Sequence, residues 1–81
     1  MVVDSRKIKK RYVDGKLSIG GAIVNPDKMR VEWNPEDLTE NVFGVLSVIR
    51  KSFGGSFKYV GDIHKLPGKS EKYAWSYEYN G

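Results

Sequence analysis

Alternating polar and apolar positions near the start of the chain predict a β-hairpin. The pattern is interrupted by Asp14-Gly15. An Asp-Gly pair between two such runs favours a type I′ turn, because both central residues of that turn take positive φ angles. Pairing Val13 with Lys16 across the turn places Tyr12 on the same face as Leu17. The expected strands cover residues 7–13 and 17–24.

A third strand is predicted after "NPDK" at residues 25–28. The proline of this stretch presets the φ angle of a type I turn. A three-residue hairpin loop closed by Lys28 in a left-handed conformation would pair Ile23 with Val31 and set Trp33 on their face. The same faces result from a five-residue loop.

The next segment predicts a helix over residues 35–53. Asn34 is a preferred N-cap residue, Pro35 suits the first helical position, and Gly54 is a typical residue to end a helix. Apolar residues follow the 3.6-residue period and predict a buried stripe. They are Leu38, Val42, Val45, Leu46, Ile49 and Phe53.

The segments "SFKYVGDIHKL" and "KYAWSYEY" predict two further strands joined by "PGKSE". Four aromatic residues share one face of the last strand and are the best partners for the helix stripe. They are Tyr73, Trp75, Tyr77 and Tyr79. The order βββαββ predicts an α+β fold in which one helix packs on one face of a small single-layer antiparallel or mixed sheet. One domain is expected over residues 1–81, in which residues 1–6 can form a flexible basic arm.

Two known layouts contain a hairpin, a helix and a second hairpin. One resembles the β-grasp arrangement of small immunoglobulin-binding bacterial domains, in which the first and last strands run parallel at the centre. The other is similar to half of the LAGLIDADG homing endonuclease saddle, whose helix ends near "FGG" before a strand pair. Here "IRKSFGGSFKYV" carries that similarity. The apolar helix with an acidic end that defines the family is replaced by "RKIKKRYV", so the metal-binding carboxylate has no matching helix.

Composition narrows the class of protein. The chain has 81 residues, of which 40% are apolar and 30% charged, as expected for one small globular domain. No window approaches the roughly 20 apolar residues of a bilayer span, and no secretory apolar region is present. We therefore expect a cytoplasmic protein without membrane contact. With no cysteine and one histidine, thiolate and His-pair metal sites are excluded, and neither metal nor cofactor is expected.

Candidate catalytic motifs have simpler structural interpretations. The "LPGKS" stretch has the wrong spacing for a phosphate-binding loop and precedes a strand, so a hairpin turn suffices. Lys58, Asp62 and His64 alternate onto one predicted strand face and could form an acid-base cluster. Spacing supplies neither a cleft nor an orienting partner, so a solvated sheet face is expected instead. We therefore predict a protein that is not an enzyme.

Charge is distributed unevenly along the chain. Residues 1–16 carry six cations and two anions, whereas the other 65 residues carry eight of each, so the whole formal charge of +4 lies in the first segment. The "RKIKKR" stretch at residues 6–11 holds five of these cations. Lysines can protect a sheet edge from pairing with other chains, but five cations in six positions exceed that need.

Nucleic-acid binding is therefore the preferred function, through phosphate contacts that release counterions and depend on salt. The predicted contact residues are Arg6, Lys7, Lys9, Lys10, Arg11 and Lys16, with Lys58, Lys65, Lys69 and Lys72 as an extension. The alternative is a protein-interaction module, an inhibitor or adaptor, that uses a sheet edge or the basic face. A homodimer is a further option, because small sheets with usable edges often pair. The aromatic strand could also stack on single-stranded bases, but a role in the core is preferred.

Overall fold

The computed structural model describes residues 10–13 and 15–80 of the chain. Four short strands come first, followed by a 3-10 turn, one α-helix and two longer strands. These elements are β1 (Lys10–Val13), β2 (Lys16–Ile19), β3 (Ala22–Asn25), β4 (Arg30–Trp33), η2 (Pro35–Asp37), α1 (Val42–Phe53), β5 (Phe57–Lys65) and β6 (Tyr73–Tyr79). The predicted α+β class, with strands on both sides of one helix, is confirmed.

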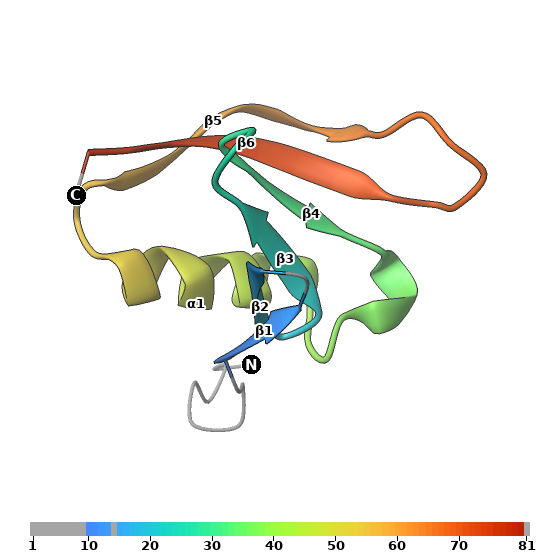
Figure 1. The fold of residues 1–81 in the computed structure, drawn as a ribbon, viewed down its shortest axis with the longest axis horizontal. Helices are drawn as coiled ribbons and strands as arrows, with labels where there is room; N and C mark the ends of the chain where they lie inside the picture. Colours follow the sequence, from blue (N-terminus) through green and yellow to red (C-terminus); the bar gives the residue numbers. More distant parts are fainter. Residues whose placement is uncertain (1–9, 14, 81) are drawn as a thin grey trace.

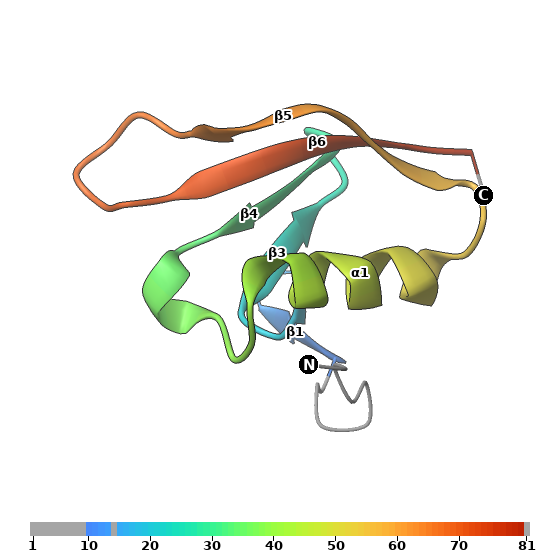
Figure 2. The ribbon, with the colours of Figure 1, turned by 180° about the vertical axis from the view of Figure 1, so that it is seen from behind.

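All six strands form one antiparallel sheet in the order β1-β2-β3-β4-β6-β5. The helix α1 lies against one face of this sheet (Figures 1 and 2). Because β1 lies at an edge and β6 lies between β4 and β5, the β-grasp layout with parallel central strands is wrong for this chain. The arrangement of hairpin, helix and hairpin is present as β3-β4, α1 and β5-β6.

The predicted second strand, residues 17–24, is divided into β2 and β3 by a turn at Gly20-Gly21. A Cβ atom on Gly21 would lie 2.0 Å from the backbone oxygen of Asp37, and the φ angle of Gly21 is +93°. The backbone N–H of Thr39 donates to the carbonyl of Gly20 at 3.0 Å. The turn is thus fixed by a segment almost twenty residues further along the chain, which local alternation does not reveal.

The register between β3 and β4 differs by one residue from the predicted one. Val24 pairs with Val31, so the predicted pairing of Ile23 with Val31 is wrong. The left-handed residue is Met29, with φ of 51°, and not Lys28. Tyr77 of β6 donates its backbone N–H to the carbonyl of Met29 at 2.9 Å. This bond to a distant strand fixes the end of the loop.

The first seven residues of the predicted helix are not α-helical. Asn34 does act as a cap, since its side chain accepts from the N–H of Glu36 at 3.0 Å, but it caps the 3-10 turn η2. The chain is extended at Leu38, and α1 begins at Val42, where the side chain of Asn41 accepts from the N–H of Phe43 at 3.0 Å. The expected C-terminal end at Phe53, followed by Gly54, is confirmed.

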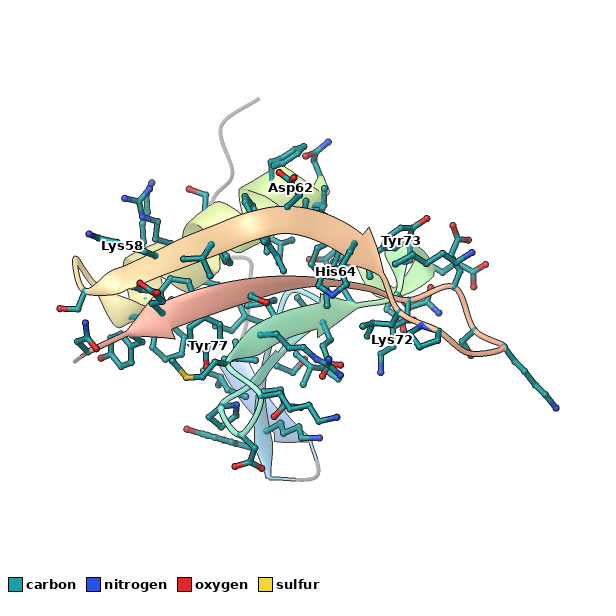
Figure 3. The ribbon with its side chains drawn as sticks, turned by 90° about the horizontal axis from the view of Figure 1, so that it is seen from above. Lys58, Asp62, His64, Lys72, Tyr73 and Tyr77 are labelled. Carbon is teal, nitrogen blue, oxygen red and sulfur yellow. The ribbon has the colours of Figure 1, made fainter. Side chains whose placement is uncertain are left out.

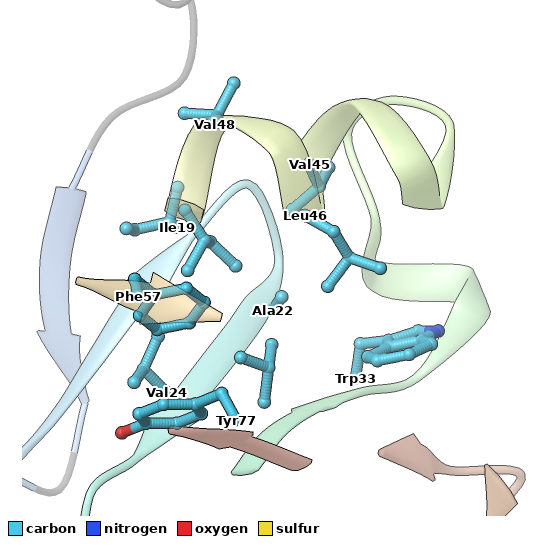
Figure 4. Close-up of a cluster of buried hydrophobic side chains, with 11 residues drawn as sticks. Ile19, Ala22, Val24, Trp33, Val45, Leu46, Val48, Phe57 and Tyr77 are labelled. Carbon is cyan, nitrogen blue, oxygen red and sulfur yellow. The ribbon is translucent and has the colours of Figure 1, made fainter. Parts of the chain in front are cut away.

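The core lies between α1 and the sheet (Figure 4). Val45, Leu46 and Ile49 of the predicted helix stripe are buried, and Val48 joins them at the rim. Leu38, Val42 and Phe53, the remaining members of the stripe, are partly buried and pack against the same cluster.

The aromatic stripe of β6 lies on the helix side of the sheet, as preferred from the sequence. Tyr77 is buried and stacks on Phe57 with ring centroids 4.6 Å apart. Trp75 is half-buried, stacks on Tyr59 at 4.5 Å and donates its indole N–H to the carbonyl of Gly61 at 2.7 Å. The hydroxyl of Tyr59 donates to the backbone of α1, and burial raises its pKa. These rings belong to the core and its margin.

Candidate nucleic-acid interface

The face of the sheet opposite α1, called the outer face here, is built by strand alternation. Cross-strand pairing aligns Ile23 with Glu32, Glu32 with Ala74, and Ala74 with His64 in one row. The next row on the same face joins Arg30 with Ser76. The Phe, Tyr and Trp side chains of β4, β5 and β6 project to the helix side, so the outer face presents mainly small and polar side chains, together with Ile23 and Val60.

An ion pair at the centre of the outer face holds Arg30 in place. Its Nη2 atom lies 2.8 Å from Oε2 of Glu32, and its Nε atom donates to the same oxygen at 3.0 Å. The other carboxylate oxygen accepts a hydrogen bond from Nδ2 of Asn25 at 3.2 Å. Asn25 and Glu32 are buried, although the helix does not cover them.

The pKa of Glu32 reflects this cluster. Burial opposes ionisation of the carboxyl group, but hydrogen bonds from Asn25 and Arg30, together with the charges of Arg30 and Lys72, outweigh burial and lower the pKa below its ordinary value. The carboxylate is therefore ionised near neutral pH. The contribution of Lys72 places its positive charge within electrostatic range of Glu32.

Of the four predicted extension residues, two belong to the outer face. Lys58 pairs with Glu78 across β5 and β6 and is exposed, and Lys72 is half-buried beside the start of β6. Figure 3 shows Lys58, His64 and Lys72 with the sheet viewed from above. Lys65 pairs with Tyr73, whose ring lies on the helix side, and Lys69 is exposed in the β5–β6 loop.

The predicted N-terminal contact residues are described only in part. Arg6, Lys7 and Lys9 lie outside the described residues. The backbones of Lys10 and Arg11 belong to β1, where they pair with Ile19 and Ser18, and their side chains also lie outside the description. Lys16 begins β2, is half-buried, and pairs with Val13 as predicted. Residues 6–16, which contain all six predicted contact residues, are called the basic segment here. This segment includes the edge strand β1.

The predicted alternation of Lys58, Asp62 and His64 is broken by a bulge. The register between β5 and β6 shifts between Val60 and His64, and Asp62 lies within the shifted stretch. The ring Nδ1 of His64 is 3.4 Å from the backbone oxygen of Asp62, at an exposed position. This contact joins the imidazole to a backbone oxygen and not to a carboxylate. The contact therefore provides no acidic side chain to orient His64 for proton transfer.

Residues 10–13 and 15–80 contain neither a metal-binding group of side chains nor a membrane-spanning helix. Within them, no group of three His, Asp or Glu side chains has the geometry to hold a metal ion. No helix in the same ranges has the length and hydropathy needed to cross a membrane.

Sequence reasoning missed the cluster of Asn25, Arg30 and Glu32. A signal was present, because Arg30 and Glu32 are oppositely charged residues two positions apart on a strand and must share a face. Asn25 could be added only with the correct β3–β4 register.

Comparison of the chain with protein-family models, curated protein sequences and solved structures gives no significant match.

Proposed function

We propose that this protein is a non-enzymatic nucleic-acid-binding domain that contacts phosphates through its N-terminal basic segment. The observation that carries the proposal is the position of the charge surplus. Six cations and two anions in residues 1–16 account for the formal charge of +4, and this segment enters the sheet at the edge strand β1. The contact residues are Arg6, Lys7, Lys9, Lys10, Arg11 and Lys16.

Phosphate contacts need few special features of the protein. Each phosphate neutralised by Lys or Arg releases condensed counterions, so a cluster of this size gives affinity that falls steeply with salt. Such contacts position the protein without reading the base sequence. The proposal therefore requires a concentration of cations and a surface that brings nucleic acid close to them, and it requires no catalytic group.

The outer face supports the proposal as a second group of cations, which lie on or beside β4, β5 and β6, across the sheet from the edge strand β1. Lys58 lies on this face, the charge of Lys72 acts on Glu32, and Arg30 is held in a defined orientation by Glu32. An anchored guanidinium loses less conformational entropy when it contacts a phosphate than a mobile one does. Glu32 and Glu78 offset part of this charge, so the outer face is a secondary contact surface.

Direct binding measurements test the function. Fluorescence anisotropy is recorded with one labelled sequence as duplex DNA, single-stranded DNA and RNA, at about 50 mM and about 200 mM salt. We expect binding of at least one form at the lower salt and a loss of affinity of at least tenfold at the higher salt. Absence of binding to all three forms near 50 mM salt would reject the proposal.

A protein-interaction module is the second candidate, and the free side of β5 favours it. This nine-residue strand forms one edge of the sheet and pairs only with β6 among the described strands. Exposed edge strands can pair with a strand of another chain. If the edge pairs with a second copy, the solution mass doubles with concentration and the outer β5 amides become protected from hydrogen exchange. A monomer with unprotected β5 amides would exclude this self-pairing.

A further inference from the structure

An apolar groove lies where the end of β4, the turn η2 and the start of α1 meet the hairpin of β5 and β6. The groove has a volume of about 350 Å³. All of its lining residues are apolar or aromatic, and they are Trp33, Pro35, Leu38, Val42, Ile63 and Tyr73. Concave sites of this size and composition are typical of ligand-binding clefts.

The walls of the groove are held by the core. Trp33 is buried beneath the start of α1 (Figure 4), and its ring stacks on Tyr73 with centroids 6.3 Å apart. Leu38 and Ile63 are partly buried and pack against the same core cluster. A preformed groove loses little conformational entropy when a ligand enters it.

The margin of the groove carries carboxylates. Oε1 of Glu71 accepts a hydrogen bond from the hydroxyl of Tyr73 at 3.0 Å, and this bond raises the pKa of Tyr73. Glu36 and Asp37 are exposed in η2, between two residues that line the groove. Three carboxylates from two separate segments therefore surround an apolar surface.

The described cations near the groove leave this charge uncompensated. Lys65 pairs with Tyr73 across β5 and β6, whereas the charge of Lys72 acts on the outer face and Lys69 is exposed in the β5–β6 loop. Among the described side chains, the ion pair at the outer face is the only one, so no described cation is paired with the three carboxylates. The margin therefore has a negative charge, which complements a cationic ligand and repels nucleic acid and anionic membrane surfaces.

The position of the groove beside a sheet edge favours a polypeptide as the ligand. Ile63 belongs to β5, which pairs only with β6 among the described strands. An extended segment of another protein can pair with a free edge strand while one of its side chains enters a neighbouring pocket. Backbone pairing then supplies affinity, and the pocket and its charges supply specificity.

We infer that this groove binds a segment of a partner protein in which one or two large apolar residues are flanked by Lys or Arg. The apolar side chains enter between Trp33 and Leu38, and the cations lie against Glu36, Asp37 and Glu71. The inference goes beyond the proposed function, because the groove is formed at β4, β6 and β5, away from the edge strand β1. Each of the two sites can bind without the other.

The test titrates the protein into a fluorescently labelled peptide, acetyl-Lys-Lys-Leu-Phe-Arg-Lys-amide, and follows anisotropy. The matched probe has serine in place of both apolar residues and carries the same charge. We expect the apolar peptide to bind at least about 10-fold more tightly than the serine peptide, because only its side chains can leave water in the groove.

A pair of protein variants tests the acidic margin. Glu36→Gln/Glu71→Gln removes two carboxylates at the groove and keeps an acceptor for the hydroxyl of Tyr73, and it should weaken binding of the apolar peptide by about 2- to 30-fold. Asp27→Asn/Glu78→Gln removes two exposed carboxylates that do not adjoin the groove lining, and it should leave affinity near that of wild type. Thermal melting should show that both variants remain folded.

Nuclear magnetic resonance locates the bound peptide without any substitution. The chain has two tryptophans, of which Trp33 lines the groove and Trp75 donates its indole N–H to Gly61. The apolar peptide should shift the indole signal of Trp33 and the amide signals of Leu38 and Val42, and it should leave the indole signal of Trp75 in place.

Three results would overturn the inference. Equal affinity for the two peptides, or no binding of either at about 1 mM protein, would show that the groove takes no apolar side chain. Equal affinity of the two charge variants would remove the role of the acidic margin. A wild type that dimerises, binds neither peptide and becomes monomeric in Glu36→Gln/Glu71→Gln would have a second copy of the chain in the groove.

Discussion

The guanidinium of Arg30 lies 2.8 Å from the carboxylate of Glu32 on the same strand and the same face of the sheet. Glu32 also accepts a hydrogen bond from Asn25 of the neighbouring strand, so one carboxylate joins β3 to β4 on the face that the helix leaves uncovered. This arrangement orients Arg30, but it also places a buried negative charge within the proposed secondary contact surface.

Removal of the Glu32 charge should strengthen nucleic-acid binding. Glu32→Gln keeps the size of the side chain and a hydrogen-bond acceptor for Asn25, while the outer face gains one net positive charge. We expect affinity to rise by about 2- to 5-fold near 50 mM salt, which corresponds to a single partly screened charge interaction. Glu36→Gln, on the exposed η2 turn, makes the same change in total charge and should have a smaller effect. Equal effects of the two substitutions would show that the outer face is not in contact with nucleic acid.

Glu32 should also make stability depend on pH in the acidic range. Its pKa in the folded state is below the ordinary value of 4.5, so its stabilising contribution is complete above that pH and is lost as pH falls through the folded-state pKa. Wild type should therefore melt at a higher temperature than Glu32→Gln at about pH 6, and the difference should shrink towards about pH 3. Thermal melts across this pH range measure the difference in melting temperature between the two proteins. A difference that grows on acidification would contradict the ion pair between Arg30 and Glu32.

Gly21→Ala should destabilise the protein much more than Gly15→Ala. Both glycines have positive φ angles, but an added Cβ on Gly21 would meet the backbone of Asp37, whereas nothing lies within 4 Å of one on Gly15. Left-handed backbone strain alone costs about 1–2 kcal/mol, and overpacking adds about 1–3 kcal/mol at Gly21. Urea denaturation of both variants measures the difference in unfolding free energy. Similar losses would mean that the Gly20-Gly21 turn does not pack against η2.

Two substitutions on one helix test the core assignment. Leu46 is 2% exposed and Phe43 is 63% exposed, so Leu46→Ala leaves a cavity and Phe43→Ala does not. Leu46→Ala should lower the unfolding free energy by about 2–5 kcal/mol, a large fraction of the stability of a small domain. Phe43→Ala should change it by less than about 0.5 kcal/mol. A reversed order in chemical denaturation would place the opposite face of α1 against the sheet.

Local chemistry in the sequence was sufficient for some elements of the fold. The Asp14-Gly15 pair correctly set the β1–β2 register, and the apolar period of the helix identified Val45, Leu46 and Ile49 as buried. These signals depend on residues close together in the chain, where turn geometry and helical spacing determine the result.

Other elements were decided by contacts between distant segments. Asn34-Pro35 has the sequence of a helix start, yet the helix begins at Val42, because the intervening segment extends to bond the Gly20 carbonyl through Thr39. The β3–β4 loop was misplaced by one residue because a bond from Tyr77 holds Met29. Local propensity cannot report such tertiary hydrogen bonds.

The candidate site was predictable to a similar extent. The sequence located the charge surplus in residues 1–16 and named Lys58, which lies on the outer face, and Lys72, whose charge acts on Glu32, as extensions. It did not identify the groove lined by Trp33 and Tyr73, because its walls come from separated elements.

The salt dependence of binding by a charge-deleted variant tests the central claim most directly. In Lys9→Ala/Lys10→Ala/Arg11→Ala, affinity for a nucleic acid should fall, and the slope of log affinity against log salt should become shallower by about 2 to 3, with melting temperature almost unchanged. Arg50→Ala/Lys51→Ala, at the end of α1, removes two cations outside the basic segment and should leave the slope near that of wild type. An unchanged affinity and slope in the first variant would contradict the account.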